Sequence, residues 1–192
     1  KIRRNDPETL IYLNNAKAVN QSPVKIAVVV PIGSNLNVAK EVLRGVAQAQ
    51  NEFNQQGGVN GRWLQVEIFN DNNDTVLAQQ VAEKIAKQQD ILAVVGHNSS
   101  NASVMAASEY QKGKIVMVTP TSDATAVTRE ASGRANYIYR TIPSTRFQAD
   151  TLSRYTVNIA KKNKIAVCID SQAEYSLPLK QDFTSAILAD GG

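Results

Sequence analysis

Residues 91–125 read ILAVVGHNSSNASVMAASEYQKGKIVMVTPTSDAT, and this stretch predicts the fold. Ile91–Val95 is an apolar run that is too short for most helices, which indicates a buried strand. Ser100 then opens a predicted helix, and the apolar run Lys114–Thr119 indicates a second strand, which Pro120 ends. Because a helix connects the two strands, we expect them to be parallel, with their carboxyl ends side by side.

The loops that follow these two strands are both polar. The first, His97–Ser100, leads into a helix start, where free N–H groups and the helix dipole favour a carboxylate or a phosphate. The second presents Thr121, Ser122 and Asp123, which offer a carboxylate and carbonyl oxygens to an ammonium group. Ligands of open α/β sheets bind at this edge. The loops therefore predict a site for a free amino acid or a similar ligand, and two ordinary capping loops are the alternative.

The rest of the chain repeats the alternation of strand and helix. Further strands are predicted at Lys25–Val30, Trp63–Phe69 and Tyr137–Thr141. The helix after the first strand is predicted to pack on the sheet through Val38, Val42, Val46, Ala49 and Phe53. Strands that alternate with helices predict an α/β fold, in which a parallel sheet is covered by helices on both faces.

The pattern divides the chain into three parts. Residues 1–22 hold a short helix before a polar break, and we interpret them as an N-terminal helical appendage. Residues 23–142 are predicted to form a nearly complete first lobe. The predicted strand Lys164–Asp170 begins KIAVCI, which nearly repeats the KIAVVV of Lys25–Val30. We therefore expect residues 143–192 to be the truncated beginning of a second, similar lobe, because a typical domain has roughly 100 to 150 residues.

The composition argues against several functional classes. Lysine and arginine are scattered among acidic residues, so the net charge of +4 provides no stripe for nucleic-acid phosphates. The single Cys168 is interpreted as a small buried hydrophobe, and one cysteine excludes an intrachain disulfide and a Cys-based zinc site. In the acidic loop Asn70–Asp74, Asp74 is interpreted as a helix cap rather than a metal ligand. No apolar run approaches the ~20 residues that cross a bilayer, and no signal-peptide or cofactor motif is present.

Short motifs stand in a characteristic order along Lys25–Gly192. They are NQQGGVNG (54–61), NDNND (70–74), GHNSS (96–100), VTP (118–120), RTIPS (140–144) and the segment 170–175. Their order and spacing resemble the type I periplasmic binding proteins, specifically the branched-chain amino-acid (Leu/Ile/Val) binding family of ABC transporters and extracellular ligand-binding receptors. The resemblance implies the periplasmic binding protein-like I fold, in which two lobes close about a hinge.

The resemblance also implies which residues contact the ligand. They are Ser99, Ser100, Thr121, Ser122, Asp123, Tyr175 and Asn37. In this family the serine at Ser100 holds the ligand carboxylate, the loop Thr121–Asp123 holds the ammonium group, and the aromatic ring at Tyr175 closes over the ligand from the second lobe. The chain departs from the family pattern at two points. Asn37 stands where relatives often carry an aromatic residue, and Asp123 replaces a hydroxyl residue.

These observations lead to a periplasmic or extracytoplasmic solute-binding protein that captures an amino acid or a related small polar ligand between two lobes for a membrane permease. One alternative is a ligand-sensing domain attached to a signalling domain. A second is an α/β enzyme of the phosphotransfer or hydrolase type, in which His97 beside Ser99 and Ser100 activates a nucleophile; the usual phosphate-binding and hydrolase motifs are absent from the sequence. A third is the core of a sugar-sensing repressor, for which the sequence offers no recognition helix.

Overall fold

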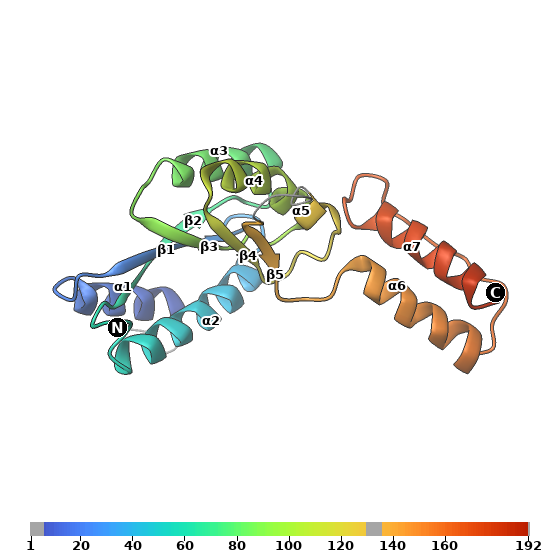
Figure 1. Cartoon of the computed structure of the whole chain (residues 1–192), viewed down its shortest axis with the longest axis horizontal. Coiled ribbons are helices and arrows are strands. Elements are labelled where there is room, and N and C mark those ends of the chain that lie inside the picture. The colour runs from blue at the N-terminus through green and yellow to red at the C-terminus, as the bar shows by residue number, and fades with distance from the viewer. Residues whose placement is uncertain (1–5, 130–135, 192) are drawn as a thin grey trace.

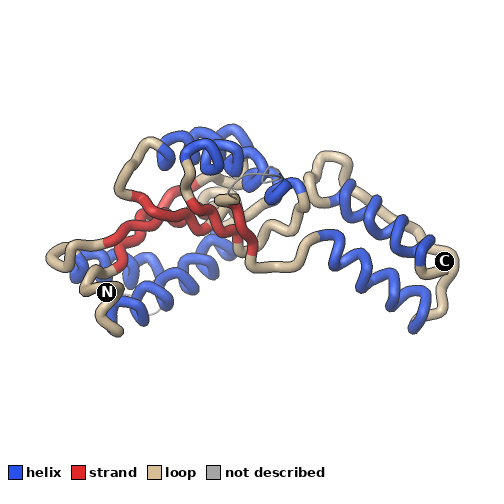
Figure 2. Tube along the Cα trace, viewed as in Figure 1, coloured by secondary structure: helices blue, strands red, loops and turns tan. Residues whose placement is uncertain are grey.

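The structure is a computed structural model that describes residues 6–129 and 136–191. A five-stranded sheet with its helices lies beside a pair of C-terminal helices (Figure 1, Figure 2). The strands are β1 (Val24–Val30), β2 (Leu64–Asn70), β3 (Ile91–Val95), β4 (Val116–Thr119) and β5 (Ile138–Arg140). The helices are α1 (Pro7–Ala18), α2 (Leu36–Gln55), α3 (Thr75–Ala86), α4 (Ser100–Gly113), α5 (Ala126–Arg129), α6 (Thr145–Arg154), the π-helical η1 (Tyr155–Ile159) and α7 (Ser176–Ala189).

The sheet is parallel, with the strand order β2-β1-β3-β4-β5. Helices α3 and α4 lie on one of its faces, and α1 and α2 lie on the other (Figure 1). Strand β1 serves both layers, because Ala27 and Val29 pack into the core under α3 and α4 while Val28 and Val30 pack toward α1 and α2. The predicted α/β fold class is confirmed.

The buried face of α2 differs from the predicted one. Its buried residues are Ala39, Leu43, Val46, Ala47, Gln50 and Asn54. Ala49, which was predicted to face the sheet, is exposed. Two buried amides of this face bond the start of β2: Gln50 Nε2 donates to the Leu64 carbonyl at 3.0 Å, and Asn54 Oδ1 accepts from Leu64 N at 2.7 Å. Amide side chains that hydrogen-bond the free backbone groups at the start of β2 are therefore buried on the face of α2 where only apolar residues were expected.

Helix α1 packs into the first lobe rather than standing apart from it. Ile11 and Ala18 are fully buried, and Ile11 belongs to the core beneath α2. The side chain of Asn15 bonds both backbone groups of Val66, accepting from the N–H at 2.9 Å and donating to the carbonyl at 2.8 Å. Strand β2 is an edge strand, so this amide replaces a missing neighbour. Helix α1 thus packs on the sheet and α2, and the assignment of residues 1–22 to a separate appendage stays a prediction.

The second-lobe residues form helices but no sheet. Among the residues that the structure describes, the segment 164–170 has no strand partner and is not a strand. Cys168 is exposed rather than buried, so both predictions for this segment are wrong. The physical reason is that strand structure depends on hydrogen bonds to a neighbour. The proposed domain boundaries stay predictions, and residues 1–5, 130–135 and 192 lie outside the described residues.

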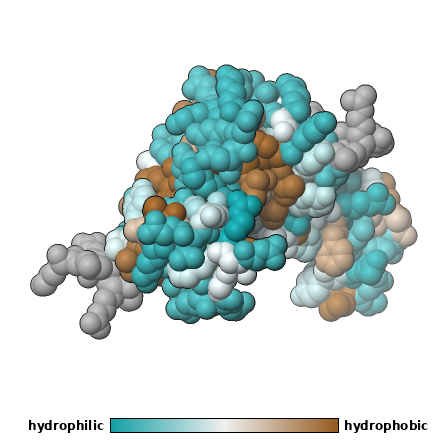
Figure 3. All heavy atoms as spheres, turned by 60° about the vertical axis from the view of Figure 1, so that its left-hand side comes forward, coloured by the Kyte–Doolittle hydropathy of each residue, from teal (hydrophilic) through white to brown (hydrophobic). Residues whose placement is uncertain are grey.

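The surface is largely hydrophilic on the side shown in Figure 3, where hydrophobic residues lie in a central patch and in smaller groups beside it. Within residues 6–129 and 136–191, no helix combines the length and apolar character needed to cross a membrane. Those same residues contain no group of three or more His, Cys, Asp and Glu side chains placed to hold a metal ion.

Candidate functional site

The loop after β3 is held in place before α4 begins. Ser99 is the N-cap of α4, and its side chain accepts from the N–H of Ala102 at 3.2 Å. The neighbouring β2–α3 loop supports it, because Asn73 Oδ1 accepts from Ser99 N and from Asn98 Nδ2, both at 3.2 Å. A capped helix start directs its first N–H groups and the positive end of its dipole toward the sheet edge.

Ser100, Ser122 and Asp123 come together at this helix start. Ser122 Oγ donates to Ser100 Oγ at 3.1 Å, and Ser100 Oγ donates to Asp123 Oδ1 at 3.4 Å. Ser122 is fully buried and Ser100 is 8% exposed, whereas Asp123 is half-buried. The loops after two neighbouring parallel strands therefore meet, as the sequence predicts. The role of these side chains in binding a ligand stays a prediction.

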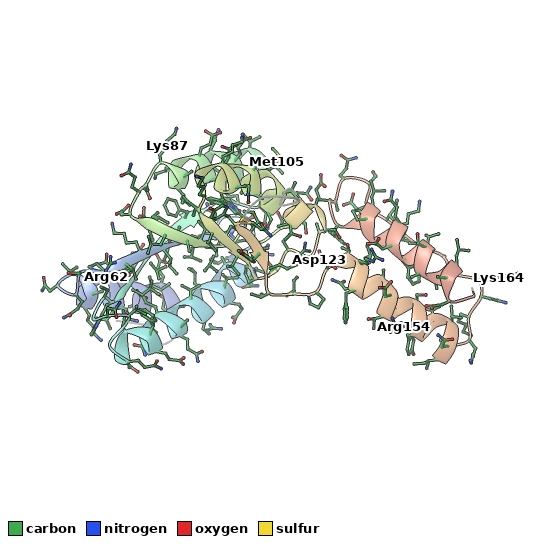
Figure 4. All side chains as sticks on the ribbon, in the orientation of Figure 1. Arg62, Lys87, Met105, Asp123, Arg154 and Lys164 are labelled. Carbon is green, nitrogen blue, oxygen red and sulfur yellow. The ribbon has the colours of Figure 1, made fainter. Side chains whose placement is uncertain are left out.

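Asp123 also joins the sheet to the second-lobe helices, and Figure 4 shows it at that junction. Its Oδ2 accepts from Gln148 Nε2 on α6 at 3.0 Å. Its backbone carbonyl accepts from Arg140 Nη1 at 2.7 Å and from Thr145 N at 3.1 Å. Burial lowers the pKa of Arg140 and the charge of Asp123 opposes that shift. The backbone carbonyl of Asp123 thus joins the loop after β4 to Arg140 and to the start of α6, while its two carboxylate oxygens accept from Ser100 and Gln148.

Thr121 and Asn37 lie at the same pocket. This pocket has a volume of about 450 Å³ and is lined by Asn37, Val38, Lys40, Glu41, Val42 and Thr121. Thr121 Oγ1 donates to the carbonyl of Asn98 at 2.7 Å, which fixes the tip of the loop after β4 on the loop after β3. The side chains of Thr121 and Asn37 are exposed. The pocket joins the start of α2 to the predicted ligand-binding edge.

Tyr175 lies apart from this group. Its ring is 43% exposed and lines a separate pocket of about 400 Å³ formed by α6, α7 and the segment 165–170. The loop that carries it is nevertheless attached to α4, because Asn101 Nδ2 donates to the carbonyl of Gln172 at 2.9 Å. Tyr175 therefore lies on the side of α6 and α7, and its contact with a ligand stays a prediction.

His97 is not paired with a serine. Its ring is fully buried, with Nδ1 at 2.7 Å from Asp71 Oδ2 and Nε2 at 3.1 Å from the hydroxyl of Tyr110. Burial, and then the charge of Asp71, raise the pKa of Tyr110. The His97 carbonyl accepts from Thr119 Oγ1 at 2.8 Å, which ties the ends of β3 and β4 together. The nucleophile pair that the enzyme alternative needs is contradicted.

Sequence reasoning missed three residues of this region: Asp71, Asn101 and Gln148. By sequence Asp71 belongs to an acidic loop, yet it is fully buried against His97. Asn101 and Gln148 are amides in the first turns of the helices that follow the site loops. That position was a usable signal, because a first-turn side chain lies beside the loop that leads into its helix.

Comparisons with known proteins agree with this geometry. A family model described as "Periplasmic binding protein" matches residues 23–192. An "Amino acid binding protein" of Pseudomonas aeruginosa is 32% identical over 139 residues, which are 72% of this chain and 36% of the relative. A "Leucine-, isoleucine-, valine-, threonine-, and alanine-binding protein" of the same organism is 30% identical over 150 residues, which are 78% of this chain and 39% of the relative.

The chain is also similar in fold to a solved structure. An ABC transporter substrate-binding protein from Desulfitobacterium hafniense, in complex with Leu, has a TM-score of 0.75 and 28% identity, covering 88% of this chain and 48% of that one. The chain thus spans less than half the length of the relatives it matches. The parallel sheet, the paired loops at its edge and the match over residues 23–192 show that this chain belongs to the periplasmic binding protein family.

Proposed function

We propose that this protein is an extracytoplasmic solute-binding protein that captures a free amino acid between two lobes for an ABC-type permease. One observation carries the proposal: the hydroxyl groups of Ser100 and Ser122 and the carboxylate of Asp123 form one hydrogen-bonded group at the start of α4. A hydroxyl at a helix start suits the carboxylate of an amino acid, and the aspartate suits its ammonium group.

One hydrogen bond of this group is long and would be the one to give way to a ligand. The Ser100–Asp123 contact is 3.4 Å long, well above the usual distance of about 2.7 to 2.8 Å for such a hydrogen bond. A ligand carboxylate would accept from Ser100 in its place, and the ligand ammonium would donate to Asp123. The ligand ammonium group would thus neutralise the half-buried carboxylate of Asp123, while the ligand carboxylate would have Ser100 as its hydrogen-bond donor.

The relatives support the ligand class. Two of them are named for amino acids that they bind, and the solved structure of a third holds Leu. The departure at Asp123 leads us to expect a stronger dependence on the ligand ammonium group than a hydroxyl residue would give, since a carboxylate forms a charge-assisted hydrogen bond.

Calorimetric titration of the full-length protein with each of the twenty amino acids tests the proposal. Ser100→Ala and Asp123→Ala should each weaken the best ligand at least tenfold, which is about 1.4 kcal/mol. Ser108→Ala is the matched control, because Ser108 lies farther along α4 and its hydroxyl bonds within that helix. Unchanged affinity in both site variants would reject the proposed function.

A further inference from the structure

Asn101 makes a two-point contact across the two lobes. It is the second residue of α4 and follows Ser100 directly. Its Nδ2 donates to the carbonyl of Gln172, and its Oδ1 accepts from the N–H of Glu174, each at 2.9 Å. These partners lie 71 and 73 residues farther along the chain. The amide thus holds two backbone groups of one loop, as a neighbouring strand would.

The loop that Asn101 holds is a fixed unit that ends at Tyr175. Asp170 Oδ1 accepts from Gln172 N at 2.8 Å, and Ser176 Oγ accepts from Asp170 N at 3.0 Å. Ser176 N in turn donates to the carbonyl of Ala173 at 3.0 Å. In Figure 1 this loop lies on the side of α7 that faces the sheet. Holding the loop at Gln172 and Glu174 therefore also places the start of α7 and the ring of Tyr175.

The contact at Asn101 differs from the one at Asp123. Thr145 and Gln148, which bond Asp123, directly follow the connection from β5 to α6, so the covalent chain itself keeps them near. The partners of Asn101 have no such tether to the first lobe. Separation of the lobes about that connection would therefore break the Asn101 contact.

We propose that Asn101 is a positioning residue that holds the Tyr175 loop across the cleft and slows release of the ligand from Ser100 and Asp123. The inference rests on the proposed function. Asn101 acts through the loop and not by touching the ligand. A contact made only in the closed state lowers the rate of opening, and hence of dissociation, more than the rate of association.

Stopped-flow binding of the best amino acid to the full-length Asn101→Ala protein tests the proposal. We expect the dissociation rate to rise about tenfold, as the loss of two neutral hydrogen bonds implies, and the association rate to stay within about twofold. Alanine favours the helix, so the melting temperature should hold. Gln48→Ala is the control, since it removes an exposed amide that bonds only Glu52. An unchanged dissociation rate would overturn the proposal, and so would an equal loss in both rates with a lower melting temperature.

A second measurement works without ligand. The single, exposed Cys168 accepts one dye, and Lys87→Cys places another on the far side of the first lobe (Figure 4). In this labelled background, Asn101→Ala should lengthen the mean separation of the dyes, and an unchanged separation would contradict the proposal. Should the wild-type protein bind none of the amino acids, the proposed function fails, but this arm still decides whether Asn101 holds the lobes together.

Discussion

Two segments with almost the same sequence have different structures in this chain. KIAVVV at 25–30 lies in the inner strand β1, between β2 and β3, where Val28 and Val30 are fully buried. KIAVCI at 164–169 is exposed along its length, and Ile165, Val167 and Ile169 each keep 39–44% of their surface in contact with solvent. The first segment has strands on both sides, whereas the second has none beside it within residues 6–129 and 136–191. The comparison shows that these residues become a strand through their neighbours and not through their propensity alone.

The helices show the same difference. Leu43 on α2 is 4% exposed because it packs on the sheet, whereas Leu152 on α6 is 49% exposed. Helices α6 and α7 pack against each other, and Phe183 is buried between the second-lobe segments. First-lobe side chains should therefore contribute much more to stability than comparable second-lobe side chains, and the predictions below test that ranking.

The largest loss is expected for His97→Ala in the first lobe. The substitution leaves the Asp71 carboxylate buried without its ring partner, and both side chains are fully buried. The lost hydrogen bonds to Asp71 and Tyr110 and the cavity left by the ring should together cost about 3 to 5 kcal/mol. The free energy of unfolding from urea titration, followed by circular dichroism, measures the loss. A loss below about 1 kcal/mol would mean that this pair does not stabilise the first lobe.

A smaller and directly comparative effect is expected from two leucines. Leu43→Ala should lower the free energy of unfolding by about 2 to 5 kcal/mol, because it opens a cavity in the core. Leu152→Ala should lower it by no more than about 0.5 kcal/mol, because that side chain is half in solvent. The same urea titration measures both. Equal losses would show that α6 is as firmly packed as α2, and would break the comparison between the lobes.

The sequence predicted what local pattern decides. The apolar runs located the strands, and Pro120 and the polar residues before α4 placed Ser100 and Asp123 at one edge of the sheet. The sequence did not predict contacts that depend on a partner far away along the chain. Gln50 is buried on α2 because its amide donates to the start of β2. Asn101 bonds a loop that lies 71 residues farther along the chain. The prediction of a strand at 164–170 was wrong because no neighbouring strand is present among the described residues to pair with it.

The smallest effect concerns pH and Tyr110. Burial raises the pKa of this phenol above its ordinary value of 10.0, so the folded protein keeps the proton that the unfolded chain releases near pH 10. The stabilisation is therefore complete below about pH 10 and declines as the pH rises further, by about 1.4 kcal/mol per pH unit. Urea titrations between about pH 9 and pH 11 should show a shallower decline for Tyr110→Phe than for the wild type. Tyr155→Phe, on an exposed ring, is the matched substitution in the second lobe. If Tyr110→Phe and the wild type lose stability in parallel, the buried group of Asp71, His97 and Tyr110 does not hold the phenol neutral.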